Sequence, residues 1–288
     1  MSPELLIVGH LTANEDRTVS GTKVSHGGSA YYCAVGASTV DPALVGVVAP
    51  VGFDFDPAPL DRLGVDRRGV HLLAGATPRF VIHQHPDGSR RFSADWGVAR
   101  GPRPWPLPAD YLNARHVHLA TAPPGQQLAW LDIARRLPRR PSVSVDLFEH
   151  FAVTFRQQSR QVRDAADLVF LNEEEHRLLG LPAGSEAVLK LGACGARYLT
   201  RGAVHHVATA PVDVVDTTGA GELLAGVFLA SRLKRVGPVE ALARAVRAAT
   251  ASVTAFGVDA PHPPLTCDVA RPVPASPDQE LQQLCVAR

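Results

Sequence analysis

Asp216-Thr217-Thr218-Gly219-Ala220-Gly221-Glu222 is a glycine-rich turn that joins a strand predicted at 212–215 to a helix predicted at 220–232. At such a junction, unpaired backbone N–H groups and the positive end of the helix dipole converge, so the turn can hold an anion such as a phosphate. Glycine lets the backbone approach the anion without a Cβ atom in the way. The glycine spacing by itself also fits a plain strand-to-helix connection.

A dinucleotide-binding turn is a weaker explanation for these glycines. In the G-x-G-x-x-G pattern the third glycine would stand at the position of Leu224. An acidic ribose-binding residue on a following strand is also missing, because Glu240 lies in a predicted helix. We therefore set the dinucleotide pattern aside.

Short apolar runs alternate with stretches of helical spacing along the rest of the chain. Apolar strands separated by helices indicate an α/β protein with a parallel sheet covered on both faces. The predicted strands are Leu5–Val8, Leu44–Val48, Val117–Leu119, Val143–Val145, Leu168–Leu171 and Val188–Leu191. The predicted helices are Ser29–Ser38, Leu128–Arg136, Arg156–Ala165, Glu173–Leu179, Ala220–Arg232 and Val239–Thr254, and a hairpin is predicted from Arg197–Thr200 and Val204–Val207.

Two segments do not fit that sheet and predict a small β-lid from about 12–26 and 78–96. The polar stretch Thr12–Ser25 is extended, and Phe80–His85 and Arg90–Asp95 flank the turn Pro86-Asp87-Gly88-Ser89. Residues 266–288 are rich in proline and polar side chains, which predicts a loosely held C-terminal tail.

The charge balance narrows the class of partner. The chain of 288 residues has 29 basic and 28 acidic side chains, so no overall field favours nucleic acid or an anionic membrane. The four cysteines form no CxxC pair, which argues against a zinc site or a disulfide framework and for a reducing compartment. We expect a cytoplasmic protein, because no secretory signal or membrane span is apparent.

The turn at 216–222 resembles the C-terminal signature D-T-x-G-A-G-D of the PfkB family of carbohydrate and nucleoside kinases, with Glu222 in place of the last Asp. Several other stretches resemble that family in the same order along the chain. These are Gly27-Gly28-Ser29-Ala30, Leu63-Gly64-Val65-Asp66 with Gly69-Val70, the "AD…xNxxE" stretch from Ala166 to Glu175, and the "LGxxG" loop Leu191-Gly192-Ala193-Cys194-Gly195. The resemblance implies a ribokinase-like three-layer α/β/α sandwich over residues 1–265, with a mostly parallel sheet and a small β-lid.

The resemblance also implies a catalytic centre at the glycine-rich turn. Glu222 takes the position of the general base, which removes the proton from the acceptor hydroxyl. Gly219, Ala220 and Gly221 would supply backbone donors to the transferring phosphoryl oxygens. A purely structural role for Glu222 remains open, because acidic residues are favoured in the first turn of a helix. Glutamate is longer than aspartate by one methylene, and a misplacement of about 1 Å can cost about 100-fold in rate.

The nucleotide and metal positions follow from the same resemblance. Asn172 and Glu175 would order water around Mg²⁺ and the phosphates of ATP, although their spacing by itself predicts a helix cap with a capping box. Gly192 and Gly195 would admit the nucleotide close to the backbone. Lys190 belongs to the same nucleotide site and stands where the family usually has a small hydroxylated residue.

Asp216 is the second candidate metal ligand, beside Glu175. It would help to hold a monovalent cation such as K⁺ near the anion turn, as in the family. It is equally well explained as a residue that caps the turn.

Residues near the N-terminus would bind the acceptor. Asn14 takes the place of the Asp that holds sugar hydroxyls in the family, so it binds a diol without charge assistance. Gly27, Gly28 and Ser29 form the expected glycine-pair contact. Tyr32 stands where the family often has Asn, and it either stacks on a ring of the acceptor or packs inside the helix.

Together these features predict ATP-dependent phosphorylation of a hydroxyl on a small sugar, polyol or nucleoside. Two alternatives remain open at this point: a catalytically silent binding or regulatory module, and a phosphate-transfer or phosphate-removal enzyme of a specialised biosynthetic pathway. The expected partners are a small-molecule acceptor and a second copy of the chain bound through the β-lid. Phe92 and Trp96 on the lid would shield the pocket from water or join that dimer contact.

Overall fold

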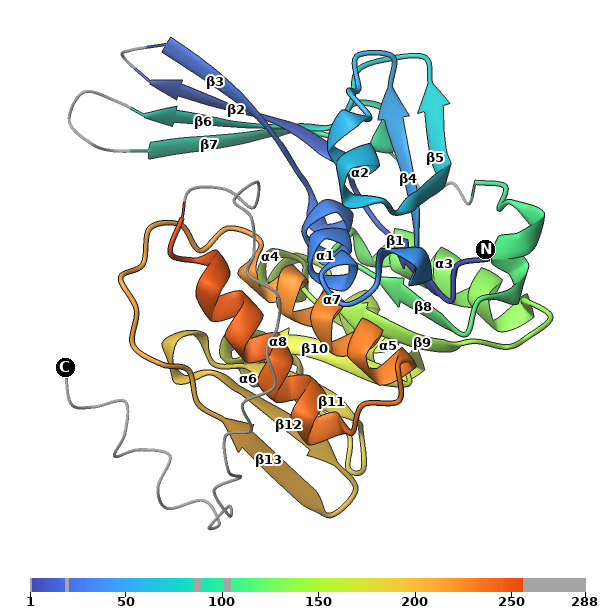
Figure 1. Ribbon diagram of the computed structural model, residues 1–288, viewed down its shortest axis with the longest axis vertical. Coiled ribbons are helices and arrows are strands. Elements are labelled where there is room, and N and C mark those ends of the chain that lie inside the picture. Colours follow the sequence, from blue (N-terminus) through green and yellow to red (C-terminus); the bar gives the residue numbers. More distant parts are fainter. Residues whose placement is uncertain (1, 19–20, 85–89, 101–104, 256–288) are drawn as a thin grey trace.

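A nine-stranded sheet forms the centre of the fold (Figure 1). The computed structural model describes residues 2–18, 21–84, 90–100 and 105–255, and it describes no side chains for residues 16–23 and 82–92. The strand order is β13-β12-β11-β10-β9-β8-β1-β4-β5, and all neighbours are parallel except the antiparallel pairs β11–β12 and β12–β13. The strands are β1 (Leu5–Val8), β4 (Val45–Gly52), β5 (Asp66–Leu73), β8 (His116–Leu119), β9 (Ser142–Asp146), β10 (Leu168–Asn172), β11 (Ala187–Lys190), β12 (Ala196–Thr200) and β13 (Ala203–Val207).

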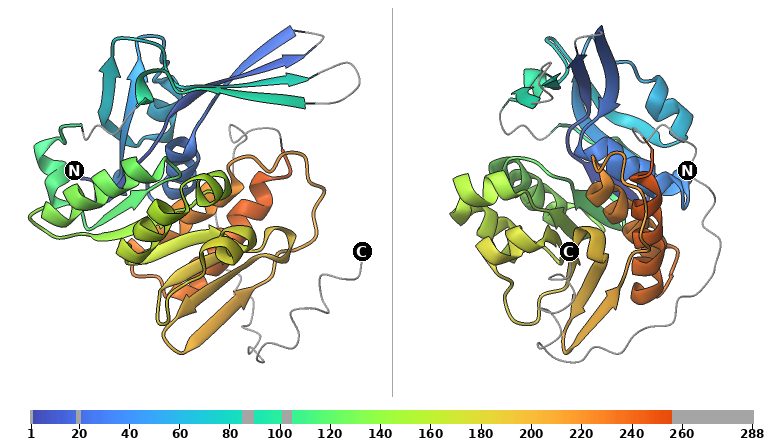
Figure 2. Two further views of the ribbon diagram at one scale, coloured as in Figure 1. Left: turned by 180° about the vertical axis from the view of Figure 1, so that it is seen from behind. Right: turned by 90° about the vertical axis from the view of Figure 1, so that its left-hand side faces the viewer.

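Helices cover both faces of the sheet, as Figure 2 shows from two further sides. Side chains alternate between the faces of a strand, so Leu5 and Ile7 enter one apolar core and Leu6 and Val8 enter the other. On the first face lie α1 (Ser29–Ser38), α7 (Ala220–Leu233) and α8 (Pro238–Ser252), with α2 (Ala58–Leu63) beside α1; on the second lie α3 (Pro124–Arg136), α4 (Glu149–Thr154), α5 (Arg156–Ala165) and α6 (Glu173–Leu179). The predicted three-layer α/β/α sandwich is therefore confirmed.

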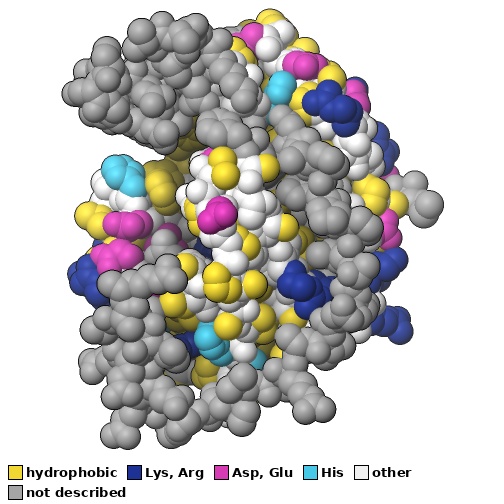
Figure 3. All heavy atoms as spheres, turned by 60° about the vertical axis from the view of Figure 1, so that its left-hand side comes forward, with side chains coloured by type: hydrophobic (Ala, Val, Ile, Leu, Met, Phe, Trp, Pro, Cys, Tyr) yellow, Lys and Arg dark blue, Asp and Glu magenta, His cyan; other side chains and the backbone are white. Residues whose placement is uncertain are grey.

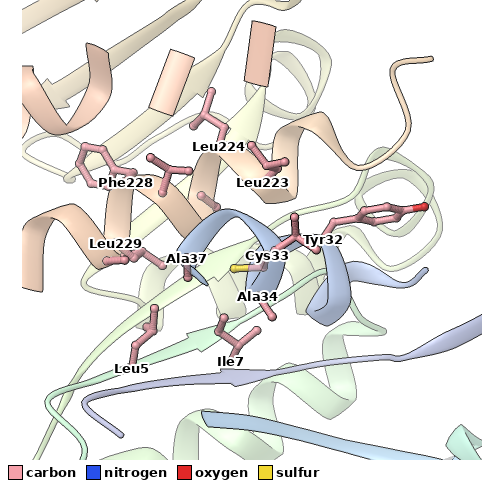
Figure 4. Packing of buried hydrophobic residues seen from close by; sticks show 14 of the residues in the cluster. Leu5, Ile7, Tyr32, Cys33, Ala34, Ala37, Leu223, Leu224, Phe228 and Leu229 are labelled. Atoms are coloured by element: carbon pink, nitrogen blue, oxygen red, sulfur yellow. The ribbon is translucent and has the colours of Figure 1, made fainter. Parts of the chain in front are cut away.

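The contact between α1 and α7 fixes the position of the glycine-rich turn. A Cβ atom on Gly226 would lie 2.0 Å from the carbonyl oxygen of Cys33, so the two helices approach closely only because this residue is glycine. Figure 4 shows Ala37 of α1 beside Leu229 of α7, and Ala34 on the side of α1 that faces Ile7 of β1. α7 is thereby packed against α1, and α1 against the main sheet.

A second, four-stranded sheet forms the lid. Its order is β3-β2-β6-β7, built from β2 (Thr12–Thr18), β3 (Gly21–Gly27), β6 (Arg79–Gln84) and β7 (Arg90–Asp95). It projects away from the main sheet at the upper edge in Figure 1. Arg79 contacts Glu15 of β2 and lies 3.2 Å from Asp54, which follows β4, so this side chain ties the lid to the main sheet.

Three elements were not predicted from the sequence. Strand β5 is an edge strand with exposed Arg67 and Arg68, so it lacks the apolar run that marks the inner strands. Helices α2 and α4 are short, and their few residues give no clear helical period. The predicted helix Val239–Thr254 ends at Ser252, and the predicted C-terminal tail lies outside the described residues.

In the part of the chain that the structure describes, no helix has both the length and the apolar character that a membrane span requires.

Candidate active site

The glycine-rich turn forms the start of α7. The prediction of a strand before it is wrong: residues 212–215 form a loop, and Val214 and Val215 are exposed rather than buried in the sheet. Gly219 has φ +77°, a left-handed conformation that favours glycine. The Oδ1 atom of Asp216 accepts a hydrogen bond from the Thr218 N–H at 3.0 Å, and the Leu223 N–H donates to the Gly219 carbonyl at 2.9 Å. The Ala220 N–H donates to the Thr217 carbonyl at 3.3 Å, whereas the N–H groups of Gly219 and Gly221 have no acceptor among the described residues and remain available to an anion. Asp216 therefore caps the turn, and its binding of a monovalent cation stays a prediction.

Three neighbouring strands bring polar side chains to their carboxyl ends beside this turn. Asp146 ends β9, Asn172 ends β10 and Lys190 ends β11, and Asn172 and Lys190 are direct neighbours in the parallel register. The Nζ atom of Lys190 lies 2.6 Å from Oδ1 of Asp146, and this carboxylate is completely buried. In open α/β sheets, ligands bind at this edge.

Four ionisable side chains at this edge of the sheet interact electrostatically: Asp146, Glu175, Lys190 and Glu222. Burial raises the pKa of the Asp146 carboxyl to about 7, although the neighbouring Lys190 ammonium opposes the shift. Burial alone would lower the pKa of Lys190, but the charges of Asp146, Glu175 and Glu222 raise it above its ordinary value. Lys190 is therefore a cation at neutral pH, surrounded by carboxyl groups.

Asn172 and Glu175 form the capping box that their spacing predicts. Asn172 Oδ1 accepts a hydrogen bond from the Glu175 N–H at 2.8 Å, and Glu175 Oε2 accepts one from the Asn172 N–H at 2.7 Å. Glu175 Oε1 also accepts a hydrogen bond from Asn172 Nδ2 at 3.0 Å, and burial raises the pKa of Glu175. The structural role of this pair is thus established by its contacts, and its role toward Mg²⁺ stays a prediction.

The two glycines of the predicted nucleotide loop have different surroundings. Gly192 has φ +54°, and a Cβ atom on it would have no neighbour within 4 Å, so its surface is open. A Cβ atom on Gly195 would lie 2.0 Å from the carbonyl oxygen of Val207. Gly192 therefore offers room for a ligand, whereas Gly195 is needed for packing against the end of β13.

The residues predicted to bind the acceptor lie where the lid meets α1. Asn14 Oδ1 accepts a hydrogen bond from the Thr12 hydroxyl at 2.8 Å, and a Cβ atom on Gly27 would lie 2.3 Å from Asn14 Nδ2. The hydroxyl of Tyr32 lies 3.1 Å from the same Cβ position. The structure thus brings Asn14, Gly27 and Tyr32 together at the base of the lid.

The other two acceptor candidates are engaged with the backbone. A Cβ atom on Gly28 would lie 2.3 Å from the His10 carbonyl oxygen, and Gly28 has φ +99°, so glycine is required there. The Ser29 hydroxyl donates to the Thr121 carbonyl at 2.8 Å. Both residues hold the loop after β1 and the loop after β8 against the start of α1.

The surface is hollowed below the lid, and hydrophobic side chains are visible in the recess (Figure 3). Trp96 lies at this side of the lid, with its ring edge-on to that of His10 at a centroid distance of 5.3 Å. His10 Nε2 is 3.1 Å from Gln126 Oε1, and burial lowers the pKa of His10 to about 4. His10 is therefore a neutral group beside Trp96; the side chain of Phe92 lies outside the described part.

Sequence reasoning missed Asp146 and His10. Asp146 directly follows the predicted strand 143–145, and His10 follows the predicted strand 5–8 after one glycine. A polar residue at the carboxyl end of a predicted strand was therefore the available signal. The same signal marks Asn172 and Lys190, which the sequence did assign to the site. What the sequence could not provide is the strand order that makes β9, β10 and β11 neighbours.

Comparisons with known proteins agree with this geometry. The model of the pfkB family carbohydrate kinases matches residues 4–264. A cytidine kinase from Thermococcus kodakarensis is 28% identical over 245 residues, which cover 79% of this chain and 87% of the relative. An ATP-dependent ribose-1-phosphate kinase from Halopiger xanaduensis is 29% identical over 239 residues, which cover 77% of this chain and 78% of the relative.

The fold has matches among solved structures. The crystal structure of a nucleoside kinase from Methanocaldococcus jannaschii, described as an archaeal member of the ribokinase family, superposes with a TM-score of 0.76 at 18% identity. The match covers 91% of this chain and 95% of that structure. At this identity the likeness shows the ribokinase-like fold, and the family match rests on the sequence. The chain is therefore an enzyme that belongs to the pfkB family of carbohydrate kinases.

Proposed function

We propose that this kinase uses ATP to phosphorylate a hydroxyl group on a small acceptor that contains a ribose ring, such as a nucleoside or a ribose derivative. The main support is that the ring of Tyr32 in α1 packs against Gly219 while its hydroxyl lies near Gly27 and Asn14 at the base of the lid, which links the glycine-rich turn to the predicted acceptor residues. Cytidine and ribose 1-phosphate, named for the two relatives, both carry a ribose ring. The ATP-dependent relative supports ATP as the donor.

The described residues suit both the phosphoryl group that is transferred and the acceptor hydroxyl that receives it. The N–H groups of residues 219–221 would stabilise charge on the transferring phosphoryl group, because they are fixed before the substrate arrives. Glu222 is half-buried in the first turn of α7, next to these donors, and would accept the proton of the acceptor hydroxyl. Asn14 has both a donor and an acceptor for the vicinal hydroxyls of a ribose.

The oxygen atoms at the edge of the sheet suit Mg²⁺. The Oδ2 atom of Asp146 is buried and has no hydrogen-bond partner among the described residues, and Glu175 lies in the same cluster. Mg²⁺ prefers such oxygen ligands and would neutralise charge on the phosphates of the nucleotide. These residues would hold the ion or its water molecules, and the K⁺ site predicted at Asp216 belongs to the same proposal.

A panel assay tests this function. ATP and Mg²⁺ are incubated with cytidine, other nucleosides, ribose and ribose 1-phosphate, with hexoses and polyols as comparison acceptors, and products are identified by phosphorus NMR. We expect transfer of a phosphoryl group to at least one ribose-containing acceptor, and a large loss of that transfer in Glu222→Gln. Binding of ATP without transfer to any acceptor would contradict the proposal.

A further inference from the structure

The positively charged ammonium group of Lys190 lies next to Gly221 in the glycine-rich turn. The Lys190 side chain is 17% exposed, and both its Cδ and Nζ atoms lie 3.2 Å from the position of a Cβ atom on Gly221. A larger residue at 221 would therefore press on the lysine side chain. The ammonium group of Lys190 lies directly against the first turn of α7, where the anion-binding N–H groups are.

The hydrogen bonds of this ammonium group are incomplete. Among the described residues, Asp146 is the one hydrogen-bond acceptor of Lys190 Nζ, through Oδ1 at 2.6 Å. An ammonium group has three N–H donors, so donors remain for a ligand. The second oxygen of Asp146, Oδ2, is also buried and lacks a hydrogen-bond partner in the described part of the chain. Buried polar atoms are almost always satisfied, so Asp146 Oδ2 marks a position for a bound ion, a water molecule or a ligand.

The charges around Lys190 make a phosphate the fitting ligand. Asp146, Glu175 and Glu222 all act on Lys190 electrostatically and keep it protonated. Ionised carboxyl groups next to the glycine-rich turn would repel a polyphosphate, because like charges at short range raise its free energy. Lys190 offsets part of that repulsion at the point where the phosphates would arrive.

We propose that the Lys190 ammonium is shared between Asp146 and a terminal phosphoryl oxygen of the nucleotide, so that Lys190 is a phosphate ligand at the Gly219–Gly221 turn. This inference rests on the proposed kinase function. Lysine suits the role, because its compact charge sits on a flexible stem and can move from one acceptor to another. Asp146 holds that charge in place before the nucleotide binds.

A simpler possibility is that Lys190 only neutralises Asp146. Removing Lys190 alone would not separate the two roles, because an unpaired buried Asp146 is itself strongly destabilising. The informative comparison is therefore Asp146→Asn, which keeps the cation, with Asp146→Asn/Lys190→Met, which removes it in a neutral background. Lys234→Met is the matched control, because Lys234 is half-exposed and pairs with Asp41 at 2.9 Å away from the turn.

Binding rather than turnover is measured, by calorimetry with the ATP analogue AMP-PNP and Mg²⁺ and separately with AMP. We expect Asp146→Asn/Lys190→Met to bind AMP-PNP about 10- to 100-fold more weakly than Asp146→Asn, because a charge-assisted hydrogen bond is lost. AMP, which lacks the terminal phosphates, should bind both variants within about threefold. Lys234→Met should bind both nucleotides like the unmodified chain.

Equal AMP-PNP affinity in the two Asp146 variants would overturn the assignment of Lys190 and leave the kinase function standing. Failure of the unmodified chain to bind AMP-PNP would instead overturn the proposed function and this inference with it. If thermal unfolding shows that the double variant does not fold, Asp146→Leu/Lys190→Met replaces it, since apolar replacement of a buried ion pair is often neutral or stabilising. The ratio of AMP-PNP to AMP affinity is then compared with that of the unmodified chain.

Discussion

The ring of Tyr32 lies directly against Gly219. A Cβ atom on Gly219 would be 2.2 Å from Cγ of Tyr32, and Tyr32 is buried at the start of α1. In Figure 4 its hydroxyl points away from the apolar core of α1 and α7, and this hydroxyl approaches Gly27 at the base of the lid. The side chain of Tyr32 thus links the glycine-rich turn to the predicted acceptor site. Packing is an observed role of Tyr32, and its contact with the acceptor stays a proposal.

Gly219→Ala should destabilise the chain and displace the turn. Its φ of +77° disfavours any side chain by about 1–2 kcal/mol, and the clash with Tyr32 adds to that cost. Gly202→Ala is the matched control, because Gly202 has φ +82° but nothing within 4 Å of a Cβ atom. Urea unfolding should show a larger loss for Gly219→Ala than for Gly202→Ala. Equal losses would mean that the turn and Tyr32 are not tightly packed.

Glu222→Gln should lower kcat by about 100-fold or more, because a positioned general base contributes about 10²–10⁴ in rate. Glu222→Asp, which restores the family signature, should retain more activity than Glu222→Gln because it keeps a carboxylate. Steady-state kinetics with the best acceptor measures both. Glu174→Gln provides the control, since Glu174 is paired with Arg177 on the surface of α6. If Glu222→Gln has the same kcat as the unmodified chain, Glu222 is not the general base and its role is to stabilise the first turn of the helix.

Asn14→Ala should raise the KM for the acceptor and leave the KM for ATP unchanged. Asn14 lies on strand β2 of the lid beside Gly27, and the predicted nucleotide residues lie on other elements, at β10, β11 and the loop after β11. Loss of one or two neutral hydrogen bonds to a diol predicts an increase of about 10-fold. Asn14→Asp tests whether charge assistance strengthens the contact. A parallel rise in both KM values would indicate that Asn14 supports the lid rather than the acceptor.

Stability should fall as the pH is lowered from about 7 to about 4. Burial lowers the pKa of His10 and of His116 from 6.5 to about 4, and lowers that of His118 further. At these three histidines the unfolded chain takes up protons in this window that the folded chain does not, so their contribution lowers the free energy of unfolding as the pH falls. The raised pKa of Asp146 acts in the opposite direction, but it is one group against three. The shifts of His10 and His116 each correspond to about 3 kcal/mol.

Denaturant unfolding at several pH values measures this slope. His116→Gln removes one titrating group, and it should flatten the slope between pH 4 and 6.5 whatever its effect on stability at pH 7. The His116 ring contacts the Ser144 hydroxyl at 2.8 Å, below the active edge of the sheet, so nucleotide binding should change little. An unchanged slope would show that His116 is not held neutral in the folded chain.

The sequence by itself determined the class of fold, the family and the position of the glycine-rich turn. Apolar strands such as Leu5–Val8, and helices such as Ser29–Ser38 and Arg156–Ala165, are marked by local periodicity, which a single sequence displays. The capping box at Asn172 and Glu175 was predictable for the same reason, because its residues are three apart. Strand β5 was not, because an edge strand with exposed arginines lacks that pattern.

Only the tertiary structure decided which residues meet. Asp146 and Lys190 are 44 positions apart, and their contact exists because parallel pairing places β9, β10 and β11 side by side with their carboxyl ends at one edge. Tyr32 meets Gly219 because α1 and α7 pack closely at Gly226. Such contacts depend on strand order and helix packing. These are fixed by the burial of apolar surface between segments far apart in the chain, so local sequence patterns do not predict them.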